Sequence, residues 1–321
     1  MTVIVRDLQP DARADTEGYA RVRHLALPYI LFTPESVRHT LAQSHPDARF
    51  RALIAVEDGE VIGAAGVSLA HDSTEPGQGY LNIYVRPDRV RRGAGRLLAR
   101  TAEEHLAAVG ATKLYTWVLD EPAHRAFAER HGYTRGRPAH FLRLDLAHGT
   151  LPPLPEVPPG VELRTAADFA DDPRPLFELD AETVSDEPGE ISVEFTDYDA
   201  WLEQNWKHPL LHPELTMAAV VDGRPVAFSV AYTDGATLPH ARTGSRGGTP
   251  MTTAMTGTAR AHRGRGLAKL AKIHSLYRAR AAGLTEAFTG NDAGNDPMIA
   301  INKWLGYEIC ATEVRYVREL G

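Results

Sequence analysis

Two arginines and two glycines alternate ahead of an apolar helix, in a pattern that suits the binding of an anion. Gly264 and Gly266 carry no Cβ, so a ligand can approach their backbone closely. The helix expected to begin at about Leu267 adds unpaired N–H groups and the positive end of its dipole, and Arg263 and Arg265 add charge. A diphosphate fits this chemistry, and a glycine-rich turn with solvated arginines fits the same residues. The Walker and dinucleotide-binding motifs are both absent.

The turn belongs to a strand, turn and helix segment that occurs twice in the chain. Tyr80–Val109 repeats the pattern of Met251–Arg280, and Val90–Gly95 aligns with Arg263–Ala268 at an offset of 173 residues (263 − 90). Matching landmarks are 158 residues apart where the copies begin, 164 at their Asp-Gly turns and 174 near their ends. An offset that only grows, and grows in loops, indicates a duplicated domain with a few insertions.

Both turns resemble the signature of the GNAT superfamily of acyl-CoA N-acyltransferases, Gln/Arg-x-x-Gly-x-Gly/Ala. Arg263–Ala268 fits every fixed position, whereas Val90 stands where Gln or Arg is expected. Thr289–Tyr307 is similar to the second helical motif of actinobacterial tandem members, and the two-copy layout is similar to that of mycothiol synthase. The resemblance implies an α/β (α+β) fold of two tandem GNAT domains, each a mixed, mostly antiparallel sheet flanked by helices.

Five prolines among residues 151–160 favour a semi-rigid spacer between the copies. We therefore expect an N-terminal GNAT-like domain at 1–147, a proline-rich linker at 148–160 and a C-terminal GNAT domain at 161–321. Apolar periodicity predicts helices at 16–27, 34–43, 175–183 and 198–206 and strands at 80–85 and 251–258, and Asp58-Gly59 and Asp222-Gly223 predict hairpin turns. A long loop at 233–250 is an elaboration of the second copy.

The resemblance implies acetyl-CoA as the acyl donor. The expected diphosphate site comprises Arg263, Gly264, Arg265, Gly266, Leu267 and Ala268. In this superfamily the fourth and fifth strands splay apart, and free N–H groups of the fourth strand hold the pantetheine and polarise the carbonyl. These positions are Thr256, Gly257, Thr258 and Ala259, and Asn295 and Asn302 join the expected cofactor site. The first copy offers Tyr84, Val85, Arg91, Arg92, Gly93, Ala94 and Gly95, so CoA binding there is also open.

The proton transfers have no evident carrier in the sequence. Many superfamily members place a tyrosine four residues before a Gly-aromatic pair, where this chain has Ala128 and Asn302. Neither is an acid, so Asn302 either hydrogen-bonds the pantetheine or thiolate or has a structural role. The strand Met251–Thr258 has no titratable residue. We name no catalytic residue and expect catalysis by proximity, with the amine proton lost to water or to an acidic loop.

Other polar clusters carry weaker signals. The acidic run Asp180, Glu182, Asp186, Glu187, Glu190 and Glu194 is by default a solvated loop, and attraction of a cationic amine is the alternative. His208 and His212 are separated by proline and do not form a helical metal pair. The single Cys310 excludes an intrachain disulfide and a cysteine-based zinc cluster, so no metal is expected. Trp201 and Trp206 are interpreted as core or pocket wall.

The 321 residues and 43% hydrophobic composition are sufficient for two domains, and the net charge of −7 argues against nucleic acid as a partner. The N-terminus has no signal pattern and no apolar run suits a membrane span, so we expect a cytoplasmic protein without a membrane partner. The expected function is an N-acetyltransferase for a primary amine of a small metabolite, such as an aminoglycoside, a peptide or an amino-sugar conjugate. Transfer is expected to be direct, in a ternary complex, with the C-terminal copy active. The alternative is a catalytically silent CoA-binding sensor or scaffold.

Overall fold

The computed structural model describes residues 2–189, 191, 193–234 and 249–320. The chain divides into two compact units: Met1–Ala139 with Ala311–Gly321, and His140–Cys310. The predicted long loop falls mostly on residues 235–248, which lie outside the described residues, as does Glu190 of the acidic run.

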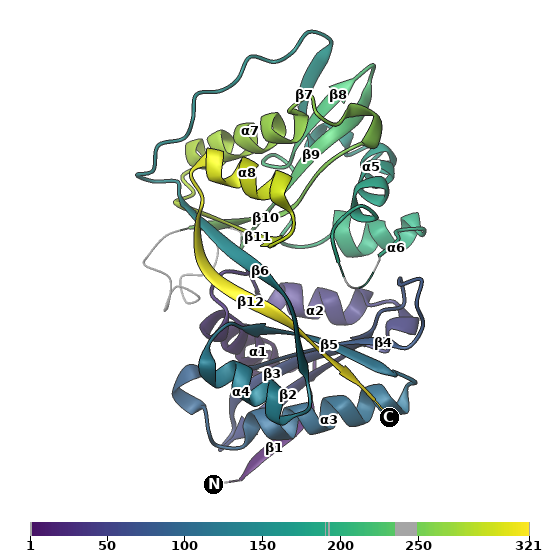
Figure 1. Ribbon diagram of the computed structural model, residues 1–321, viewed down its shortest axis with the longest axis vertical. Helices are drawn as coiled ribbons and strands as arrows, with labels where there is room; N and C mark the ends of the chain where they lie inside the picture. Colours follow the sequence, from purple (N-terminus) through teal and green to yellow (C-terminus); the bar gives the residue numbers. More distant parts are fainter. Residues whose placement is uncertain (1, 190, 192, 235–248, 321) are drawn as a thin grey trace. The chain divides into compact units, whose positions relative to one another are not determined.

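The first unit is a mixed sheet covered by helices on both faces (Figure 1). Its elements are β1 Val3–Asp7, α1 Arg13–Ala26, α2 Pro34–Gln43, β2 Arg51–Glu57, β3 Glu60–Leu69, β4 Gln78–Val85, α3 Ala94–Ala108, β5 Lys113–Leu119, α4 Pro122–Arg130, the start of β6 Thr134–Asp145 and the end of β12 Glu308–Glu319. The strands follow the order β1-β2-β3-β4-β5-β12, and the described pairings are antiparallel except for β4 with β5.

The second unit repeats this architecture, as the duplicated sequence predicted. Its elements are the end of β6, β7 Val161–Thr165, α5 Arg174–Val184, α6 Tyr198–Trp201, β8 Met217–Val221, β9 Arg224–Thr233, β10 Pro250–Thr258, α7 Leu267–Ala281, β11 Glu286–Asp292, α8 Asp296–Leu305 and the start of β12. The order is β7-β8-β9-β10-β11-β6, and β10 pairs with β11 in parallel. The expected α/β architecture of two similar domains, each a mixed, mostly antiparallel sheet flanked by helices, is confirmed.

Alternation along the central strands explains the two helical layers. In β2, Leu53 and Ala55 pack in the core that contains α3, whereas Ala52, Ile54 and Val56 pack in the core that contains α1 and α2. Successive side chains of a strand point to opposite faces, so a strand buried on both faces needs a cover on each. The second unit does the same with α7 on one face and α5 and α6 on the other.

The local predictions agree closely with the structure. Asp58, Gly59, Asp222 and Gly223 all have positive φ values of 49° to 81°, as a two-residue hairpin turn requires. The helix expected at 34–43 is α2. The helix expected at 198–206 is a single α-turn that continues as a π-helical turn from Leu202 to Trp206.

The compact units differ from the predicted boundaries at two places. Leu142 and Leu144 of β6 pack in a core of the second unit, although they precede residue 147. Val314 and Tyr316 of β12 pack in the core of the first unit, although they belong to the predicted C-terminal domain. Each unit therefore contains a core strand from the other half of the chain, a feature that local composition does not encode.

The predicted linker is also less independent than its prolines suggested. The Tyr277 hydroxyl of α7 donates to Pro152 O at 2.9 Å, and Arg280 donates to Gly149 O at 2.6 Å. Leu151 is buried in the core with α7. The start of the 148–160 run thus packs against the second unit.

Candidate active site

The turn before α7 has the backbone that an anion site needs. Arg263 is extended, Gly264 and Gly266 have φ values of 76° and 73°, and α7 begins at Leu267, as predicted. A Cβ added at either glycine would meet no atom within 4 Å, so the space before the helix is open. No side chain caps α7, which leaves the first N–H groups of the helix for a ligand. These features fit the diphosphate of CoA.

The turn before α3 in the first unit has almost the same conformation. Gly93 has a φ of 90° and precedes the first helical residue, Ala94, while Gly95 lies in the first turn of the helix. The position of Gly264 is taken by Arg91, which holds a φ of 63° in the left-handed region. For a residue with a Cβ, the left-handed conformation is about 1 kcal/mol less favourable than an ordinary one. The first copy therefore keeps the anion-binding conformation with backbone strain at Arg91.

In the second turn, the partners of the arginines are carboxylates at the end of α5 and just after it. Asp186 accepts two hydrogen bonds from Arg260, both at 2.8 Å, and a further one from Arg263. These bonds lower the pKa of Asp186 to about 2. Glu182 accepts from the backbone N–H of Arg260 at 2.6 Å. Arg265 contacts only His262 Nδ1, at 2.8 Å, and forms no ion pair in the described part of the chain.

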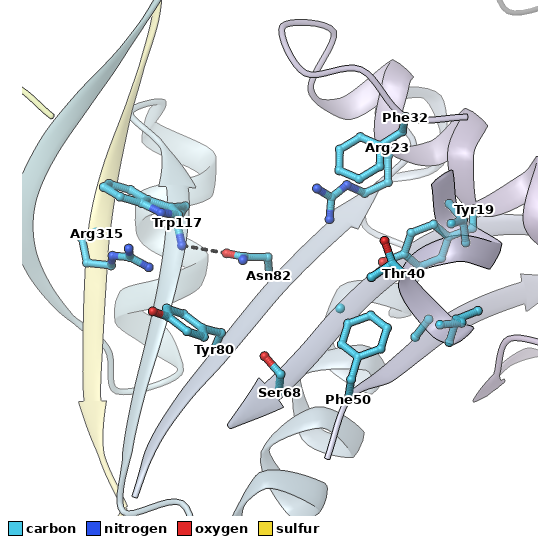
Figure 2. A pocket seen from close by; sticks show the side chains of 14 residues that line it. Tyr19, Arg23, Phe32, Thr40, Phe50, Ser68, Tyr80, Asn82, Trp117 and Arg315 are labelled. Carbon is cyan, nitrogen blue, oxygen red and sulfur yellow. Dashed lines mark hydrogen bonds between the residues drawn. The ribbon is translucent and has the colours of Figure 1, made fainter. Parts of the chain in front are cut away.

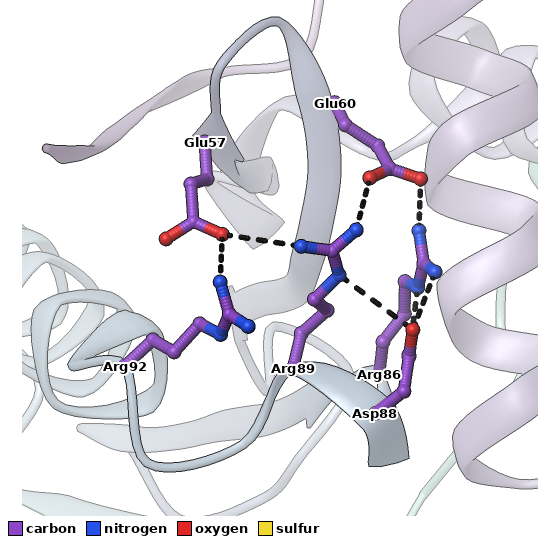
Figure 3. A network of polar contacts seen from close by, with 6 residues as sticks. All are labelled: Glu57, Glu60, Arg86, Asp88, Arg89 and Arg92. Carbon is purple, nitrogen blue, oxygen red and sulfur yellow. Dashed lines mark hydrogen bonds and ion pairs between the residues drawn. The ribbon is translucent and has the colours of Figure 1, made fainter. Parts of the chain in front are cut away.

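Near the first turn, carboxylates of the β2–β3 hairpin hold Arg86, Arg89 and Arg92 (Figure 3). Glu57, which is 5% exposed, accepts from Arg92 at 2.9 Å and lies 3.6 Å from Arg89. Glu60 accepts from Arg89 at 3.0 Å and also from Arg86, which binds Asp88 at 2.8 Å. Arg92, an expected CoA contact, is therefore already neutralised by a buried carboxylate.

The predicted splay of the fourth and fifth strands is present in both units. The parallel register of β10 with β11 ends at Thr253 and Thr289, and that of β4 with β5 ends at Tyr80 and Tyr115. An irregularity follows Thr253 in the pairing of β10 with β9. Both units thus contain the gap in which this superfamily holds the pantetheine.

Two of the four expected donors on β10, Thr256 and Thr258, have N–H groups on the side of this gap. Thr256, Gly257 and Thr258 pair with β9, and their strand has parted from β11. A Cβ at Gly257 would lie 2.6 Å from the Thr183 side chain, so glycine is required for the packing of α5. The N–H of Ala259 donates to Val226 O at 2.8 Å, and alternation along the antiparallel pair turns the N–H of Gly257 toward Phe228 of β9 as well. The prediction of Gly257 and Ala259 as free donors is therefore wrong.

The gap of the first unit is bridged by a side chain. Asn82 of β4 accepts a hydrogen bond from the backbone N–H of Trp117 of β5 at 2.9 Å (Figure 2). The turn offset of 173 residues places Met255, which cannot form this bridge, at the equivalent position. Tyr84, one of the predicted contacts here, is partly buried with the Arg23 guanidinium 3.9 Å from its ring centroid, and Val85 packs against the core.

Asn295 and Asn302 have partners within the protein. Asn295 accepts from the backbone N–H of Met298 at 3.3 Å and so caps α8. Asn302 is fully buried and donates to Asn291 at the end of β11. Its Oδ1 atom is buried without a partner in the described structure. These contacts favour the structural interpretation of Asn302 over contact with a thiolate.

A cavity of ≈210 Å³ lies beside the splayed part of β10 in the second unit. Ala254 and Met255 contribute to its wall, together with an aromatic group formed by Phe195, Trp201, Trp206, Phe228 and Tyr232. The interpretation of the two tryptophans as pocket wall is confirmed.

Asp180 of α5 is the carboxylate in this wall. It is 9% exposed, and its Oδ2 accepts from Trp201 Nε1 at 2.8 Å. Burial raises the pKa of Asp180 to about 6 and, with the Asp180 charge, raises that of Tyr232 to about 12. The solvated-loop interpretation of the acidic run is therefore wrong for Asp180, and Asp186 and Glu182 contact Arg260 instead. The sequence did contain a sign of this burial, because Asp180 lies on the same face of the predicted helix as Leu176 and Leu179.

A buried lysine lies where β10 and β11 part. Lys272 of α7 is fully buried, and its Nζ donates to Thr289 Oγ1 at 3.5 Å. Burial lowers the pKa of Lys272 to about 7, so this side chain changes charge near neutral pH. The equivalent position in the first unit is Ala99, so the lysine distinguishes the two copies.

Comparison with known proteins identifies the class. The acetyltransferase (GNAT) family profile matches residues 19–133. The mycothiol acetyltransferases of Acidothermus cellulolyticus and Frankia casuarinae are each 30% identical to this chain, over 77% and 83% of it and 74% and 72% of their own lengths. A tandem GNAT protein from the clavulanic acid biosynthesis pathway has the same fold, with a TM-score of 0.71, 21% identity and coverage of 100% of this chain and 99% of its own.

The chain belongs to the GNAT acetyltransferase family and is an acyl-CoA-dependent N-acyltransferase. Among the described residues, no helix is long and apolar enough to cross a membrane, and no three His, Cys, Asp or Glu side chains are grouped as a metal site would require.

Proposed function

We propose that this protein transfers an acetyl group from acetyl-CoA to a primary amine of a small metabolite, and that the second unit carries the reaction. The observation that supports this most directly is the aromatic cavity with buried Asp180, whose wall includes Ala254 and Met255 on the splayed segment of β10. In this arrangement a carboxylate and the strand that we propose to bind the thioester line one space. A cytoplasmic location remains an expectation from the sequence.

The donor half of the site is the turn and the gap behind it. Acetyl-CoA supplies the thioester. The diphosphate of its CoA part would lie against Gly264, Gly266 and the first N–H groups of α7, where the Arg265 guanidinium could also bind it. The backbone N–H groups of Thr256 and Thr258 would polarise the carbonyl. The named activity of the mycothiol acetyltransferases supports an acetyl donor and a small-molecule acceptor for this chain.

The acceptor half is the cavity at Asp180. Aromatic faces and a buried carboxylate both attract an ammonium group, because the rings carry negative faces and the carboxylate a full charge. With a pKa of about 6, Asp180 is mainly ionised at neutral pH and can accept the proton that the amine must lose. The amine nitrogen then bonds to the acetyl carbon as the carbon–sulfur bond breaks, and the second proton that the nitrogen loses passes through solvent to the CoA thiolate.

The test is turnover on a panel of amines that includes an aminoglycoside, an amino sugar and a dipeptide, followed as release of the CoA thiol. We expect Asp180→Asn to lower turnover by about 10²- to 10⁴-fold without changing CoA affinity, because general-base catalysis contributes about that much. The wild-type rate should fall as the pH drops through about 6. This acidic limb should be absent from the residual activity of the variant.

Asp171→Asn is the matched control, because Asp171 is exposed in the same unit and loses the same charge. Asp180→Asn keeps an acceptor for Trp201 Nε1, so the fold should persist. Full activity of Asp180→Asn would remove Asp180 from the mechanism. Tight CoA binding with no turnover on any amine would favour the sensor or scaffold instead, the function that the absent tyrosine allows.

A further inference from the structure

The first unit contains its own cavity, with chemistry opposite to that of the Asp180 cavity. It encloses ≈360 Å³, within the range of about 300–1,000 Å³ typical of small-molecule sites. Helices α1 and α2 and strands β2, β3, β4, β5 and β12 contribute to its wall. Two arginines, Arg23 and Arg315, are the only charged side chains in the described lining, and both carry a permanent positive charge.

Arg23 is buried and makes no close ion pair among the described residues. Its residue is 9% exposed, and its guanidinium carbon lies 3.9 Å from the ring centroids of both Phe32 and Tyr84. The Nε atom is buried and has no hydrogen-bond partner among the described residues, and Arg23 forms no ion pair there. Burying an unpaired charge is unfavourable unless something compensates for it. The two rings hold the guanidinium in place but do not neutralise it.

Arg315 faces the same space from the opposite side (Figure 2). Its guanidinium carbon lies 4.0 Å from the ring centroid of Trp117, which also lines the cavity. Thr40, Ser68 and Asn82 add hydroxyl and amide groups to the wall. The Oδ1 atom of Asn82 is occupied by Trp117 N–H, which leaves its two amide hydrogens for a ligand.

Glu313 is the titratable acid that acts on both arginines, but it does not line the cavity. Burial raises the pKa of Glu313 to about 7, and the two arginines oppose that shift. This carboxyl group is therefore only partly ionised at neutral pH. The lining itself carries two arginines and no carboxylate.

We propose that this cavity is a binding site for a small organic carboxylate with a flat, apolar body, a ligand class different from the amine acceptor. The carboxylate would accept hydrogen bonds from Arg23 and Arg315, and the rings of Phe50 and Trp117 would flank the body. A primary ammonium is excluded because both charges in the lining would repel it. The site does not depend on which unit transfers the acetyl group.

The test is calorimetric titration of the full-length protein with benzoate and indole-3-acetate, beside the uncharged benzamide and the cationic benzylamine. We expect at least one carboxylate to bind, with benzamide weaker by about tenfold or more and benzylamine without binding, since charge-assisted bonds to arginine supply much of the affinity. Quenching of the Trp117 fluorescence should accompany binding and should be lost in Trp117→Phe. Failure of both carboxylates to bind at about 10 mM would overturn the proposal.

Substitution separates this cavity from other cationic surfaces. Arg23→Met and Arg315→Met should each weaken carboxylate binding by about tenfold or more. Arg130→Met, which removes an exposed arginine elsewhere in the unit, should leave it unchanged. If Arg23→Met does not fold, Arg315→Met and Arg315→Lys decide the matter. Carboxylate binding that survives loss of Arg315, or benzamide binding equal to that of benzoate, would also overturn the proposal.

Discussion

The turns before α3 and α7 have nearly the same backbone and different charge partners. In the first unit, Glu57 and Glu60 of the β2–β3 hairpin hold the turn arginines. In the second unit, the matching hairpin positions are Val221 and Arg224, and the carboxylate comes from Asp186 instead. A duplicated anion-binding turn can therefore keep its shape while one matched arginine, Arg92, is held by a carboxylate and its counterpart, Arg265, is not.

The comparison extends to the gap and the cavity of each unit. Asn82 bridges β4 and β5 in the first unit, and the second unit has Met255 at that position. The first cavity is lined by two arginines, whereas the second is lined by aromatic rings and Asp180. Together these differences favour CoA and an amine in the second unit and an anion in the first.

The largest expected effect concerns the strands that each unit takes from the other half of the chain. A fragment of residues 155–321 lacks Leu142 and Leu144, which belong to the core with α7. A fragment of residues 140–310 keeps them. Because an incomplete core leaves apolar surface in water, we expect only the second fragment to unfold cooperatively in a thermal melt. Cooperative unfolding of 155–321 would restore the simple boundary at the proline-rich run.

Filling the open turn should abolish CoA binding in the second unit. Gly266→Trp puts a side chain where the diphosphate would lie, and we expect CoA affinity and turnover to fall by about 100-fold or more. Gly93→Trp is the matched change in the first unit and should leave turnover nearly intact. Gly266→Ala controls for backbone strain at positive φ. If Gly93→Trp rather than Gly266→Trp abolishes activity, the roles of the units are reversed.

Removing the matching arginines should separate binding from stability. We expect Arg265→Ala to weaken CoA binding by about tenfold, because Arg265 has no carboxylate to satisfy. Arg92→Ala should instead lower the free energy of unfolding by about 1–3 kcal/mol, since it deprives the buried Glu57 of its 2.9 Å hydrogen bond. Calorimetry and chemical denaturation measure the two effects. Equal loss of CoA affinity in both variants would contradict the comparison.

The smallest effect is expected at Asp186. Its pKa is lowered in the folded state to about 2, so its ion pairs stabilise the fold above the unfolded pKa of 3.8 and lose that contribution as the pH falls through about 2. Asp186→Asn should therefore reduce stability slightly at neutral pH and remove this acid dependence. It should also strengthen CoA binding by about threefold, because Arg263 is released. Weaker CoA binding in this variant would show that Asp186 positions Arg263 for the ligand.

The sequence by itself determined the local parts of this protein. Gly264 and Gly266 require a backbone conformation that other residues adopt only with strain, and Asp-Gly pairs specify hairpin turns, so both turns could be predicted from residue type. The growing offset between the copies predicted the duplication. These features depend on neighbours within a few residues, and periodicity records them directly.

Tertiary structure decided which residues are available for chemistry. The burial that raises the pKa of Asp180 arises from Trp201 and other side chains far along the chain, and Glu57 meets Arg92 only because the hairpin lies beside the turn. The acidic run looked uniform in the sequence because charge patterns do not report the dielectric around each carboxylate. The assignment of parts of β6 and β12 to the unit of the other half of the chain also depends on strand pairing between residues far apart in the sequence. Local sequence patterns do not specify such pairing.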